Sequence, residues 1–303
     1  MKKILPVIII MLNLPLLSSA CDTCCCSVDD RYTSILPDFR DHVMGLRYRY
    51  NSLYSQVNAG SSITSALVQY NTVELWVGWN ITRKIRIMGS VPYKFEALNN
   101  QAATKFKNGW GDMSLLGYYE LLNNRRIIDS ERSLVHNLWF GVGAELPTGK
   151  YDTGDKTMLS GNPYQLGSGS TDVIFNVVYD LNLRNVELNG SSIYKINTVN
   201  KYGYEYGNYF NVKVQAYYKL CIKPTIIVAP DIGVQFENFQ HSVDNEKWDE
   251  TGMGNLLTGT VGVETNFKRI ALGGNFQIPL QQSLGKGLLE ANNTYIIHVS
   301  FML

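Results

Sequence analysis

Residues 208–220 read NYFNVKVQAYYKL, and they alternate strictly between apolar and more polar side chains. Side chains of a β-strand point alternately to opposite faces, so this pattern predicts a strand with one face of each kind. The apolar face carries Phe210, Val212, Val214, Ala216, Tyr218 and Leu220, and the other face carries Asn211, Lys213, Gln215, Tyr217 and Lys219.

The same alternation recurs in twelve runs, most of them about ten residues or longer. Strands of soluble sheets usually have five or six residues, whereas nine to eleven residues suffice to cross a bilayer at a tilt. We therefore expect an all-β chain with membrane-spanning strands. The runs lie near residues 42–52, 70–80, 84–95, 112–122, 134–146, 171–180, 185–194, 208–220, 224–237, 257–267, 269–280 and 292–303.

The connections between these runs alternate in length. Those after the second, sixth, eighth and tenth runs are short, and most others are long and polar, the longest being 147–170. One exception, 123–133, should be short but carries several charged residues. An even strand count with alternating short turns and long loops is typical of outer-membrane barrels. The sequence predicts a transmembrane antiparallel β-barrel of about 12 strands over residues 42–303.

Residues 1–41 precede the predicted barrel. Lys2 and Lys3, an apolar stretch and a small-residue site predict a secretory signal over 1–20, which is too short to span a membrane as a helix. Residues 21–41 are predicted to form a Cys-rich periplasmic N-terminal segment, which could reach into the barrel mouth. Charged residues make up only 17% of the chain and aromatic residues 12%. This near-neutral, aromatic-rich composition argues against nucleic-acid binding and against disorder.

Five cysteines form the second unusual feature: Cys21, Cys24, Cys25 and Cys26 cluster, and Cys221 stands alone in a predicted short turn. An odd count leaves at least one thiol or intermolecular bond unexplained. Disulfides, a lipid anchor on Cys21, and copper or zinc binding by Cys24, Cys25 and Cys26 are three open readings. We expect no other cofactor.

The polar faces of the runs are candidates for the lining of a lumen. Both charge signs occur there in similar number, so the sequence predicts no strong ion selectivity, and it leaves open whether the lumen conducts or is filled. Three aromatic members could contact an apolar solute. The candidates are Arg47, Arg49, Glu74, Trp76, Lys84, Arg86, Glu120, Trp139, Glu145, Lys213, Tyr217 and Glu264.

His298 and Ser300 share one face of the last run and are a candidate base and nucleophile. A hydrolase would need both groups beside a lipid substrate. The pair falls on the more polar, inward face, so two lumen-lining groups are the favoured interpretation. We do not expect an enzyme.

Three motifs carry a family resemblance: Gly111 to Leu115 (GDMSL), Glu145 to Asp152 (ELPTGKYD) and Leu166 to Asp172 (LGSGSTD). Together they resemble the outer-membrane transporters grouped with the phenol meta-cleavage pathway. The Cys-rich start resembles exported barrels of the Bacteroidetes type. The resemblance, over about residues 70–303, implies a transporter without naming its substrate.

These observations predict a passive outer-membrane channel of a Gram-negative bacterium for a small solute that could be apolar or aromatic. Expected partners are outer-membrane lipid, the solute and the barrel assembly machinery, because the apolar alternation continues to Leu303. One alternative is a non-conducting barrel whose cysteines bind metal or anchor a periplasmic partner. A minor alternative is an outer-membrane lipid hydrolase.

Overall fold

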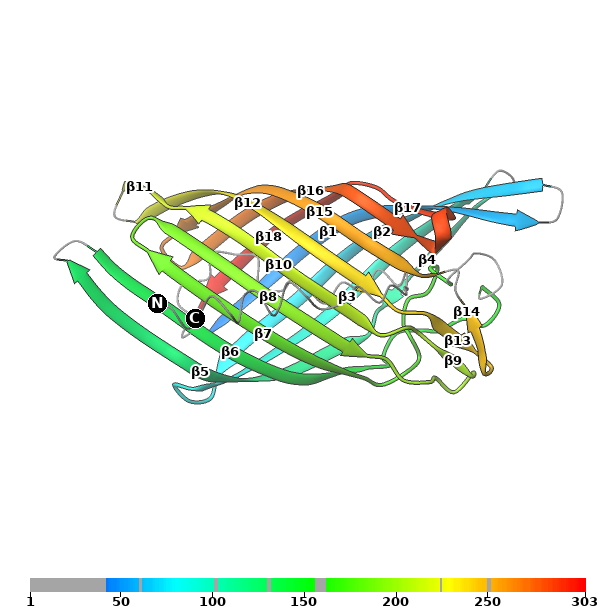
Figure 1. The fold of residues 1–303 in the computed structure, drawn as a ribbon, viewed down its shortest axis with the longest axis horizontal. Helices are drawn as coiled ribbons and strands as arrows, with labels where there is room; N and C mark the ends of the chain where they lie inside the picture. Colours follow the sequence, from blue (N-terminus) through cyan, green and yellow to red (C-terminus); the bar gives the residue numbers. More distant parts are fainter. Residues whose placement is uncertain are drawn as a thin grey trace, which may run out of the picture.

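Twelve long strands make up most of the computed structural model (Figure 1). The structure describes residues 42–59, 62–100, 103–129, 132–155, 162–223, 225–249 and 252–303. The long strands are β1 (Val43–Ala59), β2 (Ser62–Asn80), β3 (Ile85–Asn100), β5 (Met113–Asp129), β6 (Arg132–Leu146), β7 (Asp172–Leu183), β8 (Val186–Ile196), β10 (Tyr209–Tyr218), β12 (Ile226–Phe239), β15 (Gly254–Phe267), β16 (Ile270–Leu284) and β18 (Thr294–Met302).

These strands close into one antiparallel barrel. Each long strand pairs with the next long strand along the chain, and β18 pairs with β1 over Val43↔Met302 to Tyr50↔Tyr295. Closure leaves the barrel wall without an unpaired edge, which is a requirement for a sheet in lipid. The predicted twelve-strand barrel is confirmed.

The two ends of the barrel differ. Connections such as 184–185 and 268–269 lie at one end, the short-turn end, and those such as 147–171 and 197–208 lie at the other, the long-loop end. Residues 1–20 and 21–41, the predicted signal and Cys-rich segment, lie outside the described residues. No helix in the described part of the chain is long and apolar enough to cross a membrane.

Several short elements extend the wall or cover the long-loop end, and the sequence did not predict them. The strands are β4 (Thr104–Trp110) beside β3, β11 (Leu220–Lys223) beside β12, β17 (Leu289–Ala291) between β1 and β16, and a separate sheet of β9 (Tyr204–Glu205), β13 (Ser242–Asp244) and β14 (Lys247–Asp249). A 3-10 helix, η2 (Gly285–Gly287), precedes β17.

Burial alternates along the strands with polar groups inside. On β12, Asp231, Gln235 and Glu237 are buried, while Ile232 and Val234 are exposed. The same apolar exterior surrounds the barrel, for example at Leu46, Leu75, Leu115, Phe140, Val177, Leu188, Val214, Val261, Leu272 and Ile297. This arrangement is the inverse of a soluble protein and presents an apolar surface to lipid.

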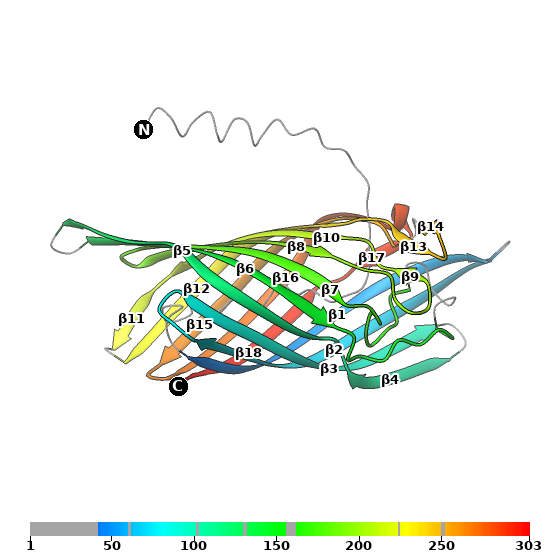
Figure 2. The same cartoon turned by 90° about the horizontal axis from the view of Figure 1, so that it is seen from below.

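The connection 123–133, the exception among the short connections, is not a long loop. Instead, β5 and β6 continue as a paired hairpin to Asp129 and from Arg132, with register shifts at Glu120/Leu122 and Ile127/Asp129. The two strands extend past their neighbours at the short-turn end, as the turned view shows (Figure 2). Polar residues are compatible with a strand that has left the bilayer, which is why composition alone suggested a loop.

Candidate functional site

The inner face of the barrel holds the residues predicted to line a lumen. Ten of the twelve candidates are buried. Arg49 is half-buried, and Lys84 is exposed in the turn before β3. The buried ones are Arg47, Glu74, Trp76, Arg86, Glu120, Trp139, Glu145, Lys213, Tyr217 and Glu264. Except for Lys84, the structure therefore places the candidates on inward-facing positions; whether they line an open path stays a prediction.

Sequence reasoning missed several charged groups on the same face. Glu96, Glu187 and Lys195 are buried. Asp180 is half-buried and lies on the same face of β7 as Asp172. Each occupies the inward parity of its strand, so the alternation itself was the available signal. Glu96 and Lys195 lie one residue beyond the predicted runs near 84–95 and 185–194, whereas Asp180 and Glu187 fall inside their runs and were overlooked despite the correct parity.

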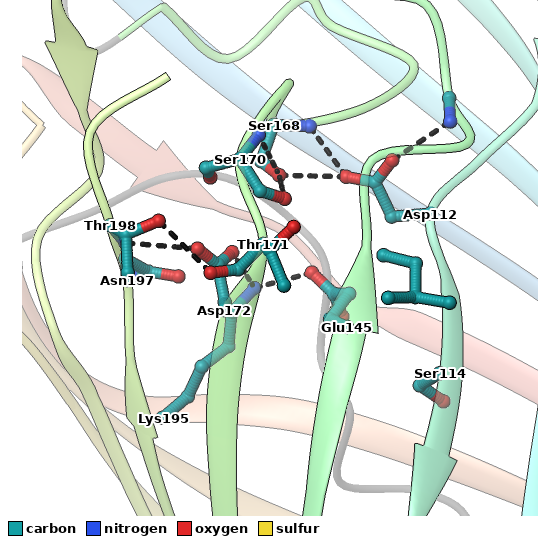
Figure 3. A network of polar contacts seen from close by, with 12 residues as sticks. Asp112, Ser114, Glu145, Ser168, Ser170, Thr171, Asp172, Lys195, Asn197 and Thr198 are labelled. Carbon is teal, nitrogen blue, oxygen red and sulfur yellow. Dashed lines mark hydrogen bonds and ion pairs between the residues drawn. The ribbon is translucent and has the colours of Figure 1, made fainter. Parts of the chain in front are cut away.

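The three motifs that carried the family resemblance meet at Asp112, which is buried just before β5 (Figure 3). Its Oδ1 accepts a hydrogen bond from the Gly149 backbone N–H at 2.8 Å. Its Oδ2 accepts from the Ser168 N–H at 2.6 Å and from the Ser168 hydroxyl at 2.8 Å. A single carboxylate thus holds both ends of the loop between β6 and β7, and these bonds are charge-assisted. We call Asp112, Gly149 and Ser168 the Asp112 hub.

Two glycines allow this contact. A Cβ on Gly167 would lie 2.5 Å from Asp112 Oδ1 and 2.7 Å from the Cα of Gly149. A Cβ on Gly149 would in turn lie 2.8 Å from the Cα of Gly167. The two backbone segments therefore pack directly on each other, at a distance that no other residue permits.

Beyond the hub, the loop folds over the long-loop end. Tyr164, Gln165 and Leu166 are buried, and Tyr164 packs in an apolar cluster with side chains of β1, β2 and β3. The Lys107 ammonium on β4 donates to the Tyr164 carbonyl at 2.9 Å, and the Tyr70 hydroxyl on β2 donates to the Pro163 carbonyl at 2.9 Å. The described second half of the loop is thus tied to β2 and β4, which lie beyond β5 along the wall of the barrel.

The phenol of Tyr164 is neutral at physiological pH. Burial, with the negative charges of Glu96 and Asp155 nearby, raises the pKa of Tyr164 to about 12. On the outer side of the loop, Asp152 behaves in the opposite way. A hydrogen bond from the Gly154 N–H, aided by Lys150, lowers the pKa of the Asp152 carboxyl below its ordinary value.

Just inside the hub, three neighbouring strands contribute a buried ion cluster (Figure 3). The Lys195 ammonium on β8 lies 2.5 Å from Glu145 Oε1 on β6 and 3.3 Å from Asp172 Oδ2 on β7. Asp172 Oδ1 also accepts from the Thr198 N–H at 2.9 Å. Two carboxylates therefore share one ammonium in an almost fully buried setting.

A second charged network lies on β1, β2, β15 and β18. Arg47 pairs with Glu74 at 3.3 Å, and His298 Nε2 lies 3.0 Å from Glu264 Oε2. His298 and Ser300 are both buried on the interior face. Neither therefore reaches the outer apolar surface, where a lipid substrate would lie.

Apolar side chains also occur inside the barrel, which the polar interior of such proteins does not lead one to expect. One cluster, the inner apolar belt, contains Val43, Trp76, Met88, Leu116, Tyr118, Trp139, Ile174, Val178, Ile193 and Tyr209. A second, the mouth cluster, contains Leu53, Ala66, Val68, Tyr70, Leu98, Tyr164, Leu284 and Leu289. Phe239 packs against both clusters and joins them.

Of the five cysteines, only Cys221 lies within the described residues. Cys21, Cys24, Cys25 and Cys26 lie outside the described residues, and Cys221 is an exposed free thiol. Cys221 belongs to β11 and not to the turn in which the sequence placed it. Among the described residues, no group of three or more His, Cys, Asp or Glu side chains is arranged to hold a metal ion.

No family model matches the sequence, and no curated protein matches it. Among solved structures, the chain is similar to the COG4313 outer membrane channel from Pseudomonas putida F1, with a TM-score of 0.60 and 15% identity over 91% of this chain and 100% of that one. The fold is that of the outer-membrane β-barrels of Gram-negative bacteria. The translocator domain of autotransporter NalP from Neisseria meningitidis is more distant, with a TM-score of 0.42 and 8% identity over 86% and 88% of the two chains.

This similarity confirms the predicted resemblance at the level of the fold. The narrower affiliations, with the meta-cleavage transporters and with Bacteroidetes barrels, stay predictions. The same holds for recognition of the last strand by the barrel assembly machinery.

Proposed function

We propose that the chain is a passive outer-membrane channel for a small solute with an apolar or aromatic part. The observation that supports this proposal is that the two apolar clusters inside the barrel are continuous. The inner apolar belt and the mouth cluster meet at Phe239, which lies on the inward side of β12. Apolar groups at these positions do not face lipid but pack on one another inside the barrel, so a solute that crosses the interior would pass between them.

The hub-anchored loop fits the same proposal. It places Tyr164 in the mouth cluster, where a solute would enter from the long-loop end. Because the loop is fixed at its base by charge-assisted bonds, it would act as a constriction of defined size. The similarity to a solved outer membrane channel is consistent with this role.

The test is single-channel recording from the full mature chain in planar bilayers. We expect discrete conductance steps. Replacing Phe239 with Ala should raise the step size, since the side chain would narrow the path between the two clusters. The matched control is Phe236→Ala on the same strand, where the side chain points outward and is exposed. It should leave the step size unchanged.

A companion recording without residues 21–41 asks whether that segment restricts the lumen. Larger steps after truncation would make it a plug. A folded barrel that gives no steps with or without the segment would contradict the channel and favour the alternative, in which the N-terminal cysteines bind metal or hold a periplasmic partner.

A further inference from the structure

We infer that the solute is a small organic cation, with an apolar or aromatic body and a positive charge. This inference rests on the proposed channel function and names its substrate class. The inference is based on how acidic and basic side chains are distributed over the interior. From the sequence alone, their numbers looked similar.

The wall formed by β5 to β15 is strongly acidic on its inner side. Its inward-facing acidic residues are Asp112, Glu120, Glu145, Asp172, Asp180, Glu187, Asp231, Glu237 and Glu264, and its inward-facing basic residues are Lys195, Lys213 and Lys219. The lysines are already engaged with these acids. Lys195 contacts both Glu145 and Asp172, and Lys219 lies 2.5 Å from Glu187. The wall therefore keeps a clear excess of negative charge.

The facing wall of β1 to β3 does not cancel this excess. Arg47, Arg49, Arg86 and Lys94 face inward there, together with Glu74 and Glu96. The surplus of basic over acidic groups on this wall is smaller than the acidic surplus opposite. β16 adds no charged inward group, and β18 adds only His298. Summed over the described interior, the charge is negative, so the interior attracts cations and repels anions.

The order of residues along β7 places this charge on both sides of the inner apolar belt. Its inward side chains run Asp172, Ile174, Asn176, Val178, Asp180, and both Ile174 and Val178 belong to the belt. With a rise of roughly 3.3 Å per residue, the two carboxylates stand about 26 Å apart along the strand. Asp172 joins Glu145 at the long-loop side of the belt.

We call Glu145 and Asp172 the long-loop acidic layer and Asp180, with the carboxylates near it, the short-turn acidic layer. Strands near β7 add carboxylates to the short-turn layer. Glu120 on β5 is paired in register with Trp139 of the belt and accepts a hydrogen bond from Asn123. Asp180 accepts a hydrogen bond from Asn189, and Glu187 follows on β8. A solute that crosses the belt thus meets carboxylates before and after it.

The belt itself is suited to a cation with an aromatic or alkyl body. Its largest members are Trp76, Trp139 and Tyr118, all buried on the inner face. Aromatic faces attract cations as well as apolar groups, and the attraction strengthens where water is scarce. A neutral apolar solute would gain only from the belt, and an anion would be opposed by both acidic layers.

The experiment uses three aromatic solutes of nearly equal size and different charge: benzylamine, benzyl alcohol and benzoate. The full mature chain is reconstituted in planar bilayers, and reversal potentials are recorded in a potassium chloride gradient and with benzylammonium or benzoate salts. Entry of the neutral benzyl alcohol is measured by the rate at which proteoliposomes swell. We expect a reversal potential of the cation-selective sign and a permeability for benzylammonium about threefold or more above that for benzoate.

Two variants connect the preference to the acidic layers. Glu120→Gln and Asp180→Asn, singly and together, keep the side-chain shapes and remove charge, so the cation preference should fall stepwise while conductance steps persist. Glu290→Gln is the control, because Glu290 is an exposed acid of β17 and not part of the layers. It should leave the preference unchanged.

The possible results separate the two proposals. Conductance steps with equal or greater permeability for benzoate would overturn the cation inference and leave the channel standing. A cation preference that Glu120→Gln and Asp180→Asn do not reduce would also overturn it, since the acidic layers would not be its source. A folded barrel without any steps would overturn the channel, and the inference would fall with it.

Discussion

The two ends of the barrel are built by different kinds of interaction. At the short-turn end, Leu183 and Val186 are joined by two residues, and Phe267 and Ile270 by two more. Beyond their own hairpins, these turns bond to the backbone of the neighbouring segment, as Asn185 O does to the Lys219 N–H and the Lys268 N–H does to Thr225 O. At the long-loop end, the Asp112 hub joins residues that lie 37 and 56 positions apart in the sequence. One end is thus held by tight turns and backbone bonds to adjacent segments, and the other by a side chain that joins distant segments, so the two should respond differently to substitution.

The largest expected effect is at the long-loop end, with Lys195→Met. The change leaves Glu145 and Asp172 buried side by side without their shared cation, and an uncompensated buried charge typically costs about 3–5 kcal/mol. The free energy of unfolding, measured by urea titration of the barrel folded in lipid vesicles, should fall by that amount. Lys150→Met, at an exposed pair with Asp152, is the control and should change stability by less than about 0.5 kcal/mol.

Asp112→Asn should come next. The amide group keeps one acceptor oxygen but turns an NH2 toward backbone N–H donors, so the loop loses part of its anchor at a cost of about 2–3 kcal/mol. Limited proteolysis should then cut the loop between β6 and β7 faster than in the parent. Glu246→Gln, an exposed residue of the turn between β13 and β14, serves as the control. Unchanged proteolysis in Asp112→Asn would mean that the hub does not hold the loop.

Gly167→Ala probes the same contact by volume instead of charge. Its Cβ meets Asp112 and the Gly149 backbone well inside contact distance, so the loop base must move apart, at a cost of about 1–3 kcal/mol. Gly117→Ala is the matched control, because its Cβ would have no neighbour closer than 3.9 Å. Equal urea midpoints for the two variants would show that the base of the loop is loosely packed.

The smallest effect, with the opposite sign, is expected at the short-turn end from Lys268→Gly. Lys268 has φ 55°, a left-handed conformation that is costly for any side chain and free for glycine. Relief of this cost, reduced by the greater freedom of glycine in the unfolded chain, should stabilise the barrel by at most about 1 kcal/mol. A clear loss of stability in the same urea titration would show that Lys268 contributes more than its backbone.

The same division explains what the sequence could reveal. Each of the twelve strands lies close to an alternating run, because side-chain parity is a local property and one face had to be apolar to meet lipid. Parity also placed Arg47, Glu74 and Trp139 on the inner side correctly. The strand extension to Asp129 was missed, since polar residues outside the bilayer carry no alternation signal.

Contacts between distant segments were beyond such reasoning. The motifs around Gly111, Gly149 and Ser168 were recognised separately, but nothing in their spacing indicates that one carboxylate joins them. The acidic surplus was hidden for a related reason. Glu96 lies just beyond the predicted run near 84–95, while Asp180 and Glu187 lie at or near the limits of the runs near 171–180 and 185–194, and none of the three was counted as inside.

The Asp112 hub has a further consequence for how this barrel can vary. Because one carboxylate binds both Gly149 and Ser168, it holds the two ends of the loop between β6 and β7 together. We call this base the neck of the loop, and the bonds that hold it do not involve the residues beyond it. Lengthening a loop whose ends are already fixed is cheap, since each doubling adds only about 0.6 kcal/mol of closure entropy. We therefore expect insertions at the exposed Thr153 and Gly154 to be tolerated as long as the buried Tyr164, Gln165 and Leu166 are kept, so that the outer part of the entrance can vary while the wall of the barrel stays the same.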